Sequence, residues 1–315
     1  ADAVGARVSQ VRGCVTFLVW AEASFGVRRC TDFQRNLGIA RTLLSDRRGQ
    51  LVENDILERR SYQERPPRSE YRLTDKGRDL YGVTVAIIDS GVEGDHPAVG
   101  GKLVRSVKVE LAANPDDDPV ILDDDDALDV VGHGTACAGI IHAIAPGADL
   151  VSVRVLGPDN RGKGIVFAAG LDWAIDQGAG VMNLSLSSKS DALFGLFHDL
   201  ADRAYFANAL LVCAANNVPG NSYPSLFASV VSVAAHDLPD PAAWFYNSRP
   251  PVEFGAHGLD VDVAWRGGSR MTATGNSFAA PHIAGYAALI RAKHPEVTPF
   301  EVKAILAATA TRPRA

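Results

Sequence analysis

The 315-residue sequence has no uninterrupted run of about 18 apolar residues of the kind that crosses a membrane. Its N-terminal stretch also lacks the basic segment, apolar run and small-residue cleavage site of a secretory signal. The sequence therefore predicts no membrane span. It favours a cytoplasmic location, and secretion would require a leader ahead of Ala1.

Cysteine is scarce and its spacing carries no recognisable chemistry. Cys14, Cys30, Cys137 and Cys213 form no C-x-x-C pair and no metal-ligand pattern. A chain of this length does not depend on a disulfide scaffold. We expect buried or half-buried free thiols, no metal and no cofactor.

Charge is unevenly distributed along a chain of ordinary globular composition, which is 47% hydrophobic and 22% charged. Residues 1–82 hold 15 Lys and Arg against 11 Asp and Glu, a net charge of +4. Residues 83–315 hold 16 against 26, a net charge of -10. The length suits one large and one small domain, and this contrast predicts a boundary between residues 82 and 83.

The N-terminal segment reads as two short helices and a hairpin. Thr31 is the expected N-cap of the first helix, and Leu37-Gly38 separates it from the second. Two alternating runs then flank the turn-forming Pro66-Pro67. The segment from about Phe25 to Tyr81 resembles the HxlR-type winged-helix transcription regulators, whose wing carries a similar E-R-P-P-R run followed by L-T-x-x-G-R-x-L.

That resemblance implies that the second helix enters the DNA major groove and that wing arginines meet phosphate. The DNA-contact candidates are Arg41, Arg47, Arg48, Arg65 and Arg68. Two departures leave an alternative open. Gly49 lies in the middle of the second helix, and the regulators' C-terminal dimerisation helix is missing, so the segment is equally readable as an appendage that binds nothing.

From Gly82 onward, short β-branched runs alternate with alanine-rich helical stretches. This alternation is typical of parallel strands linked by helices and buried on both faces. We therefore expect a three-layer α/β/α sandwich with a mainly parallel sheet. The aspartate-rich stretch between Asn114 and Asp129 is expected to be a solvated loop, with a metal site as the alternative.

Three motifs place side chains that can take part in catalysis at the carboxyl ends of strands or the starts of helices, where such sheets bind their ligands. Asp89 ends the strand in V-A-I-I-D-S-G-V, His133 opens a helix in G-H-G-T-A-C-A-G-I-I, and Ser277 opens another in T-G-N-S-F-A-A-P-H-I-A-G. A serine hydroxyl is a poor nucleophile unless an imidazole accepts its proton, and a carboxylate can orient that imidazole. Taken alone, Ser277 is also readable as a helix N-cap.

Together these motifs resemble the subtilases, and the resemblance covers residues 83–315. It implies a serine endopeptidase that cleaves extended peptide or protein segments through an acyl-enzyme, with Asp89, His133 and Ser277 as its triad. Asn217 in V-C-A-A-N-N-V-P-G matches the oxyanion-hole side chain, and a slip of one residue would put Asn216 there. The implied substrate-binding residues are Arg161, Gly162, Lys163, Gly164, Ser185, Leu186, Ser187, Ala214, Ala215 and Asn216.

Several positions depart from the family pattern. Ser187 and Ser188 stand where many subtilases have glycine, and Asn216 also replaces a glycine. These changes predict a narrow, polar specificity pocket that prefers small or polar side chains before the scissile bond. Asn276 replaces the usual threonine before the nucleophile, and the calcium-holding insertion after the histidine helix is absent, so we expect no strong calcium dependence. The alternative overall function is a DNA-binding regulator fused to a peptide-sensing or self-processing protease domain.

Overall fold

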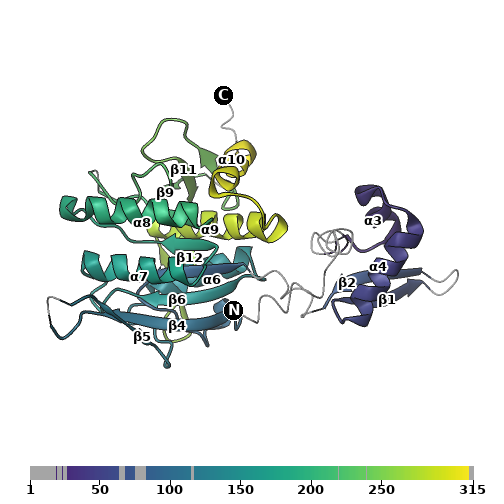
Figure 1. Cartoon of the computed structure of the whole chain (residues 1–315), viewed down its shortest axis with the longest axis horizontal. Helices are drawn as coiled ribbons and strands as arrows, with labels where there is room; N and C mark the ends of the chain where they lie inside the picture. The colour runs from purple at the N-terminus through teal and green to yellow at the C-terminus, as the bar shows by residue number, and fades with distance from the viewer. Residues whose placement is uncertain are drawn as a thin grey trace. The chain divides into compact units, whose positions relative to one another are not determined.

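The computed structural model describes residues 19, 23, 27–63, 68–74, 83–114, 117–218, 220–238 and 240–311. The chain divides into two compact units, residues 1–82 and 83–315, and each is described separately (Figure 1). No helix within these ranges is long and apolar enough to span a membrane.

Residues 27–74 of the first unit, apart from the undescribed 64–67, contain two helices followed by an antiparallel hairpin, in the order that the sequence predicts. These elements are α3 (Cys30–Leu37), α4 (Arg41–Glu53), β1 (Leu57–Gln63) and β2 (Arg68–Leu73). Leu57 pairs with Leu73 across the hairpin. The buried core includes Phe33, Leu44, Leu51 and Leu57, so both helices and the first strand contribute to it.

Helix limits in this unit differ in one respect from the prediction. Helix α3 begins at Cys30 with Arg29 as N-cap and without a side-chain cap, so the prediction of Thr31 as N-cap is wrong. Gly38, at a φ of 62°, ends the helix as expected. Helix α4 runs through Gly49 unbroken. The predicted Pro66-Pro67 turn lies outside the described residues.

The second unit is built on a nine-stranded sheet of order β10-β11-β9-β8-β7-β3-β6-β4-β5. The sheet is parallel except at its two edges, where β10 and β5 run antiparallel to their neighbours. Its strands are β3 (Thr84–Asp89), β4 (Leu103–Glu110), β5 (Val120–Asp123), β6 (Asp149–Arg154), β7 (Val181–Leu184), β8 (Leu210–Ala214), β9 (Val231–His236), β10 (Phe245–Tyr246) and β11 (Phe254–His257).

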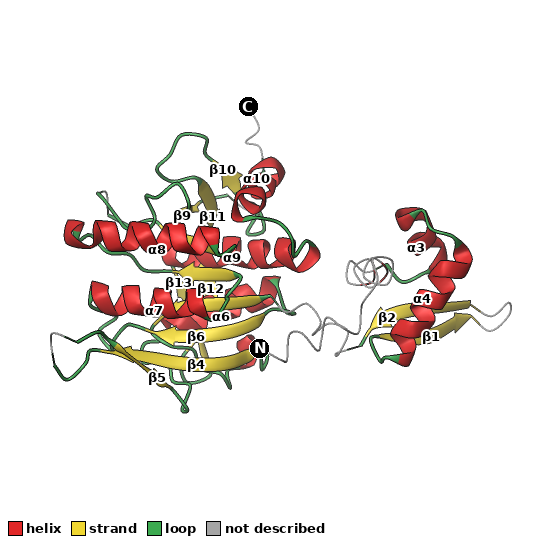
Figure 2. Ribbon diagram, viewed as in Figure 1, coloured by secondary structure: helices red, strands yellow, loops and turns green. Residues whose placement is uncertain are grey.

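Helices cover both faces of this sheet, as the ribbon diagram shows (Figure 2). They are α6 (His133–Ile144), α7 (Gly164–Asp176), α8 (Phe194–Phe206), α9 (Asn276–Lys293) and α10 (Pro299–Thr309), with short 3-10 turns η2 (Pro97–Val99) and η3 (Asp191–Leu193). A separate hairpin, β12 (Val261–Trp265) and β13 (Ser269–Ala273), packs on α6. The predicted three-layer α/β/α sandwich is therefore confirmed.

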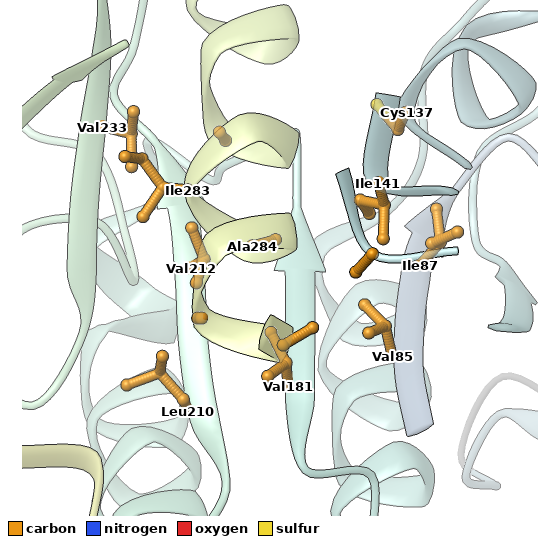
Figure 3. Close-up of a cluster of buried hydrophobic side chains, with 14 of the residues drawn as sticks. Val85, Ile87, Cys137, Ile141, Val181, Leu210, Val212, Val233, Ile283 and Ala284 are labelled. Carbon is orange, nitrogen blue, oxygen red and sulfur yellow. The ribbon is translucent and has the colours of Figure 1, made fainter. Parts of the chain in front are cut away.

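Alternating side chains of the central strand serve two cores. In β3, Val85 and Ile87 pack with α6 and α9, and Figure 3 shows them beside Ile141. Ala86 and Ile88 point the other way and pack with α7 and α8. Burying an aliphatic side chain of this size contributes about 1.5–3 kcal/mol, so both faces of β3 stabilise the fold and hold its last residue in place.

The aspartate-rich stretch is not the wholly solvated loop that we expected. It contains the edge strand β5, which pairs with β4. Asp124 is buried and accepts hydrogen bonds from Arg154 at 3.0 and 3.2 Å. Asp129 is also buried, at the start of the histidine helix. The apolar V-I-L run between the two aspartate clusters supplies the strand that the charge count concealed.

Candidate active site

The carboxylate of Asp89 and the imidazole of His133 form a buried pair. Asp89 ends β3 and is fully buried, and His133 is the first residue of α6. His133 Nδ1 lies 2.8 Å from Asp89 Oδ1 and 2.9 Å from Oδ2. Because Nδ1 faces the carboxylate, the other ring nitrogen remains for a substrate or nucleophile.

The electrostatic surroundings of His133 favour its charged form. Burial by itself lowers the pKa of His133, but attraction to Asp89, the hydrogen bond with Asp89 and the charge of Asp129 outweigh it, so the pKa is raised above its ordinary 6.5. A raised pKa makes the imidazole a stronger base.

Asp129 holds the start of the histidine helix. Its Oδ1 accepts from the Val131 and Gly132 backbone N–H groups and from Ser90 Oγ, at 3.0, 2.7 and 2.8 Å. Its Oδ2 accepts from the N–H and hydroxyl of Thr135, at 2.8 and 2.7 Å. One buried carboxylate therefore ties the first turn of α6 to the residue after Asp89. This role was not predicted from the sequence, although an acidic residue four positions before the helix start at His133 could have indicated it.

Glycines on both sides of His133 permit close approach. Gly132 has a φ of 114°, and a Cβ there would lie 2.6 Å from the Trp265 indole. A Cβ on Gly134 would lie 2.0 Å from the Gly91 carbonyl oxygen. The G-H-G motif is thus required by packing around the imidazole.

Ser277 lies in the first turn of α9 and shares two hydrogen bonds with Ser185. The Ser277 hydroxyl donates to the Ser185 carbonyl at 3.1 Å, and the Ser185 hydroxyl donates to the Ser277 carbonyl at 2.9 Å. In this arrangement the nucleophile candidate is hydrogen-bonded to the chain just beyond β7, not to the imidazole. Ser277 and His133 nevertheless line one cavity of about 580 Å³. Catalytic hydrogen bonds are often long or unformed before substrate binds.

Two asparagines organise the region around Ser277. The Asn276 backbone N–H donates to Asn217 Oδ1 at 3.0 Å, which leaves Asn217 Nδ2 as a donor. Asn276 Oδ1 accepts from the Ala235 N–H at 2.8 Å, and its Nδ2 donates to the Ala215 carbonyl at 3.1 Å. The side chain that replaces the usual threonine therefore ties the serine turn to β9 and to the segment after β8.

The structure brings most of the predicted substrate-binding residues to this cavity. Its lining includes Arg161, Gly162, Gly164, Ser185, Leu186, Ser187, Ala214, Ala215, Asn216 and Asn217. Lys163 instead lines a neighbouring cavity of about 500 Å³, which also contains Arg161. Ser188 lines the main cavity as well, and its backbone exchanges two hydrogen bonds with Tyr223, at 2.9 and 2.8 Å.

A buried thiol lies beneath the pair. Cys137 Sγ is 3.3 Å from Ser185 Oγ and 3.9 Å from Asp89 Oδ2. Among the described residues, Asp89, His133 and Cys137 are the one group of three whose ligand atoms come together as a metal site requires. Burial and the charge of Asp89 raise the pKa of Cys137 well above its usual value. A buried thiol with a raised pKa stays protonated and is a poor nucleophile.

The arginines predicted to contact DNA differ in exposure. Arg41 and Arg68 are exposed, and Arg47 is half-buried with its Nη1 on Gln50. Arg48 is buried, donates to the Leu44 carbonyl and stacks over the Tyr71 ring at 4.4 Å. Its interpretation as a DNA contact is therefore wrong, because its guanidinium is used inside the unit. Arg65 lies outside the described residues.

Comparisons with known proteins identify the family of the chain. A model of the subtilase family matches residues 81–315, and one of HxlR-like helix-turn-helix proteins matches residues 12–94. The chain belongs to the subtilase family. Its first unit carries the HxlR-like helix-turn-helix match.

Individual relatives are moderately similar. A thermostable alkaline protease of Halalkalibacterium halodurans is 32% identical, covering 73% of this chain and 62% of the protease. Subtilisin BL of Lederbergia lenta is 32% identical, covering 73% and 84%. An intracellular serine protease of Paenibacillus polymyxa is 31% identical, covering 67% of each. The solved structure of a cold adapted subtilisin-like serine proteinase superimposes with a TM-score of 0.59 at 28% identity, covering 74% and 84%.

Proposed function

We propose that this protein is a serine endopeptidase that hydrolyses peptide bonds through Asp89, His133 and Ser277. The observation that carries the proposal is the 2.8 Å pair of His133 and Asp89 at a cavity that Ser277 and Asn217 also line. Membership of the subtilase family supports the same chemistry.

In the proposed mechanism, the Ser277 hydroxyl leaves the Ser185 carbonyl and its Oγ bonds to the substrate carbonyl carbon while His133 Nε2 takes its proton. The oxyanion accepts hydrogen bonds from Asn217 Nδ2 and the Ser277 backbone N–H. His133 then gives the proton to the leaving amine, and the acyl-enzyme remains. Water repeats the attack, and the bond from Oγ to the acyl carbon breaks to release the acid.

Phenylmethylsulfonyl fluoride tests the nucleophile directly. We expect stoichiometric labelling of Ser277, identified by peptide mapping, and loss of both labelling and peptidase activity in Ser277→Ala. Ser248→Ala, which alters an exposed serine, is the matched control and should behave as wild type. Labelling that persists in Ser277→Ala would overturn the assignment.

The hydroxyl groups of Ser187 and Ser188 and the side chain of Asn216 line the cavity where glycines would leave more room. We infer a preference for small or polar side chains directly before the scissile bond. A fluorogenic peptide library checks this inference, and large aromatic residues as the best substrates there would contradict it.

A DNA-binding role for the first unit is the second candidate function. The HxlR-like match and the helix-helix-hairpin order favour it. Exposed Arg41 on the second helix would face the major groove, and exposed Arg68 of the wing would meet phosphate. Mobility shifts on duplex DNA that weaken with salt and with Arg41→Ala and Arg68→Ala would support it. Absence of any shift for the full chain would leave the unit as an appendage.

A further inference from the structure

The cavity above Ser277 has a basic and hydroxyl-rich wall. Arg161 and Lys189 contribute positive charge, and Ser187, Ser188 and Ser190 contribute hydroxyl groups. Among the described residues that line it, none carries a carboxylate. The neighbouring cavity, which shares Arg161, adds Lys163 and is also lined by Glu110 and its ion-pair partner Lys108.

Within the described ranges, no carboxylate forms an ion pair with Arg161, Lys163 or Lys189, although other cations nearby are paired. Arg154 pairs with Asp124 at 3.0 Å and Lys108 with Glu110 at 2.9 Å. Arg154 and Lys108 are thus each neutralised by a carboxylate, whereas the three cleft cations are not.

The acidic residues closest in sequence to the cleft cations have other partners. Asp159 Oδ1 accepts from the Arg161 backbone N–H at 3.2 Å. Asp191 Oδ1 accepts from the Tyr223 hydroxyl at 2.9 Å. Both carboxylates moderate the local potential, but neither neutralises the Arg161 guanidinium or the Lys189 ammonium by direct contact.

This basic wall belongs to an acidic protein. Residues 83–315 hold 16 basic against 26 acidic side chains, so a random stretch of this surface would be negative. A cleft whose charge opposes that of the surrounding surface concentrates oppositely charged ligands and disfavours like-charged ones.

We propose that the cleft selects peptide segments with Asp or Glu among the four residues before the scissile bond, through Arg161 and Lys189. This inference rests on the proposed peptidase function and defines its substrate class. The two cations lie on opposite segments, one before α7 and one after β7, between which an extended peptide would lie. An exposed charge pair changes a rate constant by about 1.4-fold to fivefold, so two together give about twofold to 25-fold.

The test compares fluorogenic peptides that differ only by Glu, Gln or Lys at each of the four positions. We expect kcat/KM to rank Glu above Gln above Lys in at least one position. The advantage of Glu over Gln should shrink between about 0.01 M and 1 M salt, because the screening length falls from about 30 Å to 3 Å.

Variants then assign the preference to its residues. The ratio of kcat/KM for the Glu and Gln peptides should fall toward one in Arg161→Gln/Lys189→Gln. It should stay at the wild-type value in Arg249→Gln, which removes one positive charge from an exposed position outside the cavity lining.

The outcomes separate two failures. Cleavage without any preference for Glu over Gln, or a preference that survives the double variant, overturns the charge selection alone. Failure to cleave any peptide, together with no labelling of Ser277, overturns the peptidase function and this inference with it.

Discussion

Asn276→Ala tests whether the residue before the nucleophile positions the oxyanion donor. The substitution removes the hydrogen bond to Oδ1 from the Ala235 N–H and the hydrogen bonds from Nδ2 to the Ala215 carbonyl and, at 3.4 Å, to the Asn216 carbonyl. It leaves the backbone N–H that donates to Asn217 Oδ1. The segment that carries Asn217 then loses its hydrogen bonds to the Asn276 side chain, while both proposed oxyanion donors remain present.

The expected magnitude follows from these contacts. The two shorter of these hydrogen bonds, at about 0.5–1.5 kcal/mol each, give a loss of about 1–3 kcal/mol in the free energy of unfolding. Misplacing a catalytic group by about 1 Å costs up to about 10²-fold in rate. Complete removal of an oxyanion donor costs about 10²–10³-fold, a size known from subtilisin, which sets the ceiling. We therefore expect kcat to fall about tenfold to 100-fold with KM changed much less.

A double-mutant cycle with Asn217→Ala separates positioning from general destabilisation. If Asn276 acts through Asn217, then Asn276→Ala should cost less than about threefold in kcat once Asn217 is already alanine. Steady-state kinetics on one fluorogenic peptide and urea denaturation of all four proteins supply the data.

Ser232→Ala is the matched structural control. Its hydroxyl also makes two hydrogen bonds from β9, to the Pro251 carbonyl at 2.8 Å and from the Glu253 N–H at 3.0 Å, but away from the serine turn. It should lose similar stability and keep its kcat. If Asn276→Ala is destabilised as expected yet keeps kcat within about threefold of wild type, the positioning argument is refuted.

Three further predictions concern titration, reactivity and packing. Carboxylates beside His133 outweigh the effect of its burial and raise its pKa. Because the base must be neutral to accept a proton, kcat/KM should rise with pH as His133 deprotonates, with a midpoint above 6.5. A midpoint below 6.5 in the pH profile would contradict this. Iodoacetamide should modify half-exposed Cys30 but not buried Cys137 in the folded protein, and equal labelling rates by peptide mapping would count against it. Gly132→Ala places a Cβ 2.6 Å from the Trp265 indole at a φ of 114°. Urea denaturation should therefore show a loss of at least about 2 kcal/mol in the free energy of unfolding. A smaller loss would show that the indole can move aside.

Local sequence patterns were enough to predict the sheet and the order of the candidate triad. Asp89, His133 and Ser277 each stand at a strand end or helix start, and parallel strands bring such positions to one edge. The hydrogen-bonded pair of Asp89 and His133 is consistent with that expectation.

Long-range contacts were beyond the same reasoning. The five hydrogen bonds of Asp129 depend on where the helix and Ser90 meet in space, and its acidic surroundings suggested solvent. The hydroxyl of Ser277 donates to Ser185, 92 residues away, which no spacing reveals. The sequence indicated Arg48 as a surface cation, because nothing in its spacing shows that Tyr71 of the hairpin packs against its guanidinium.

Because β3 packs on both of its faces, enzyme activity can be used to monitor the packing of both helical layers. Its neighbours on either side belong to separate apolar clusters, yet a single carboxylate is fixed at its tip. Loosening of either layer would free that carboxylate before the backbone is fully lost. Residual activity during heating or in denaturant would therefore depend on both helical layers remaining folded. Partial unfolding of one layer should be enough to abolish activity.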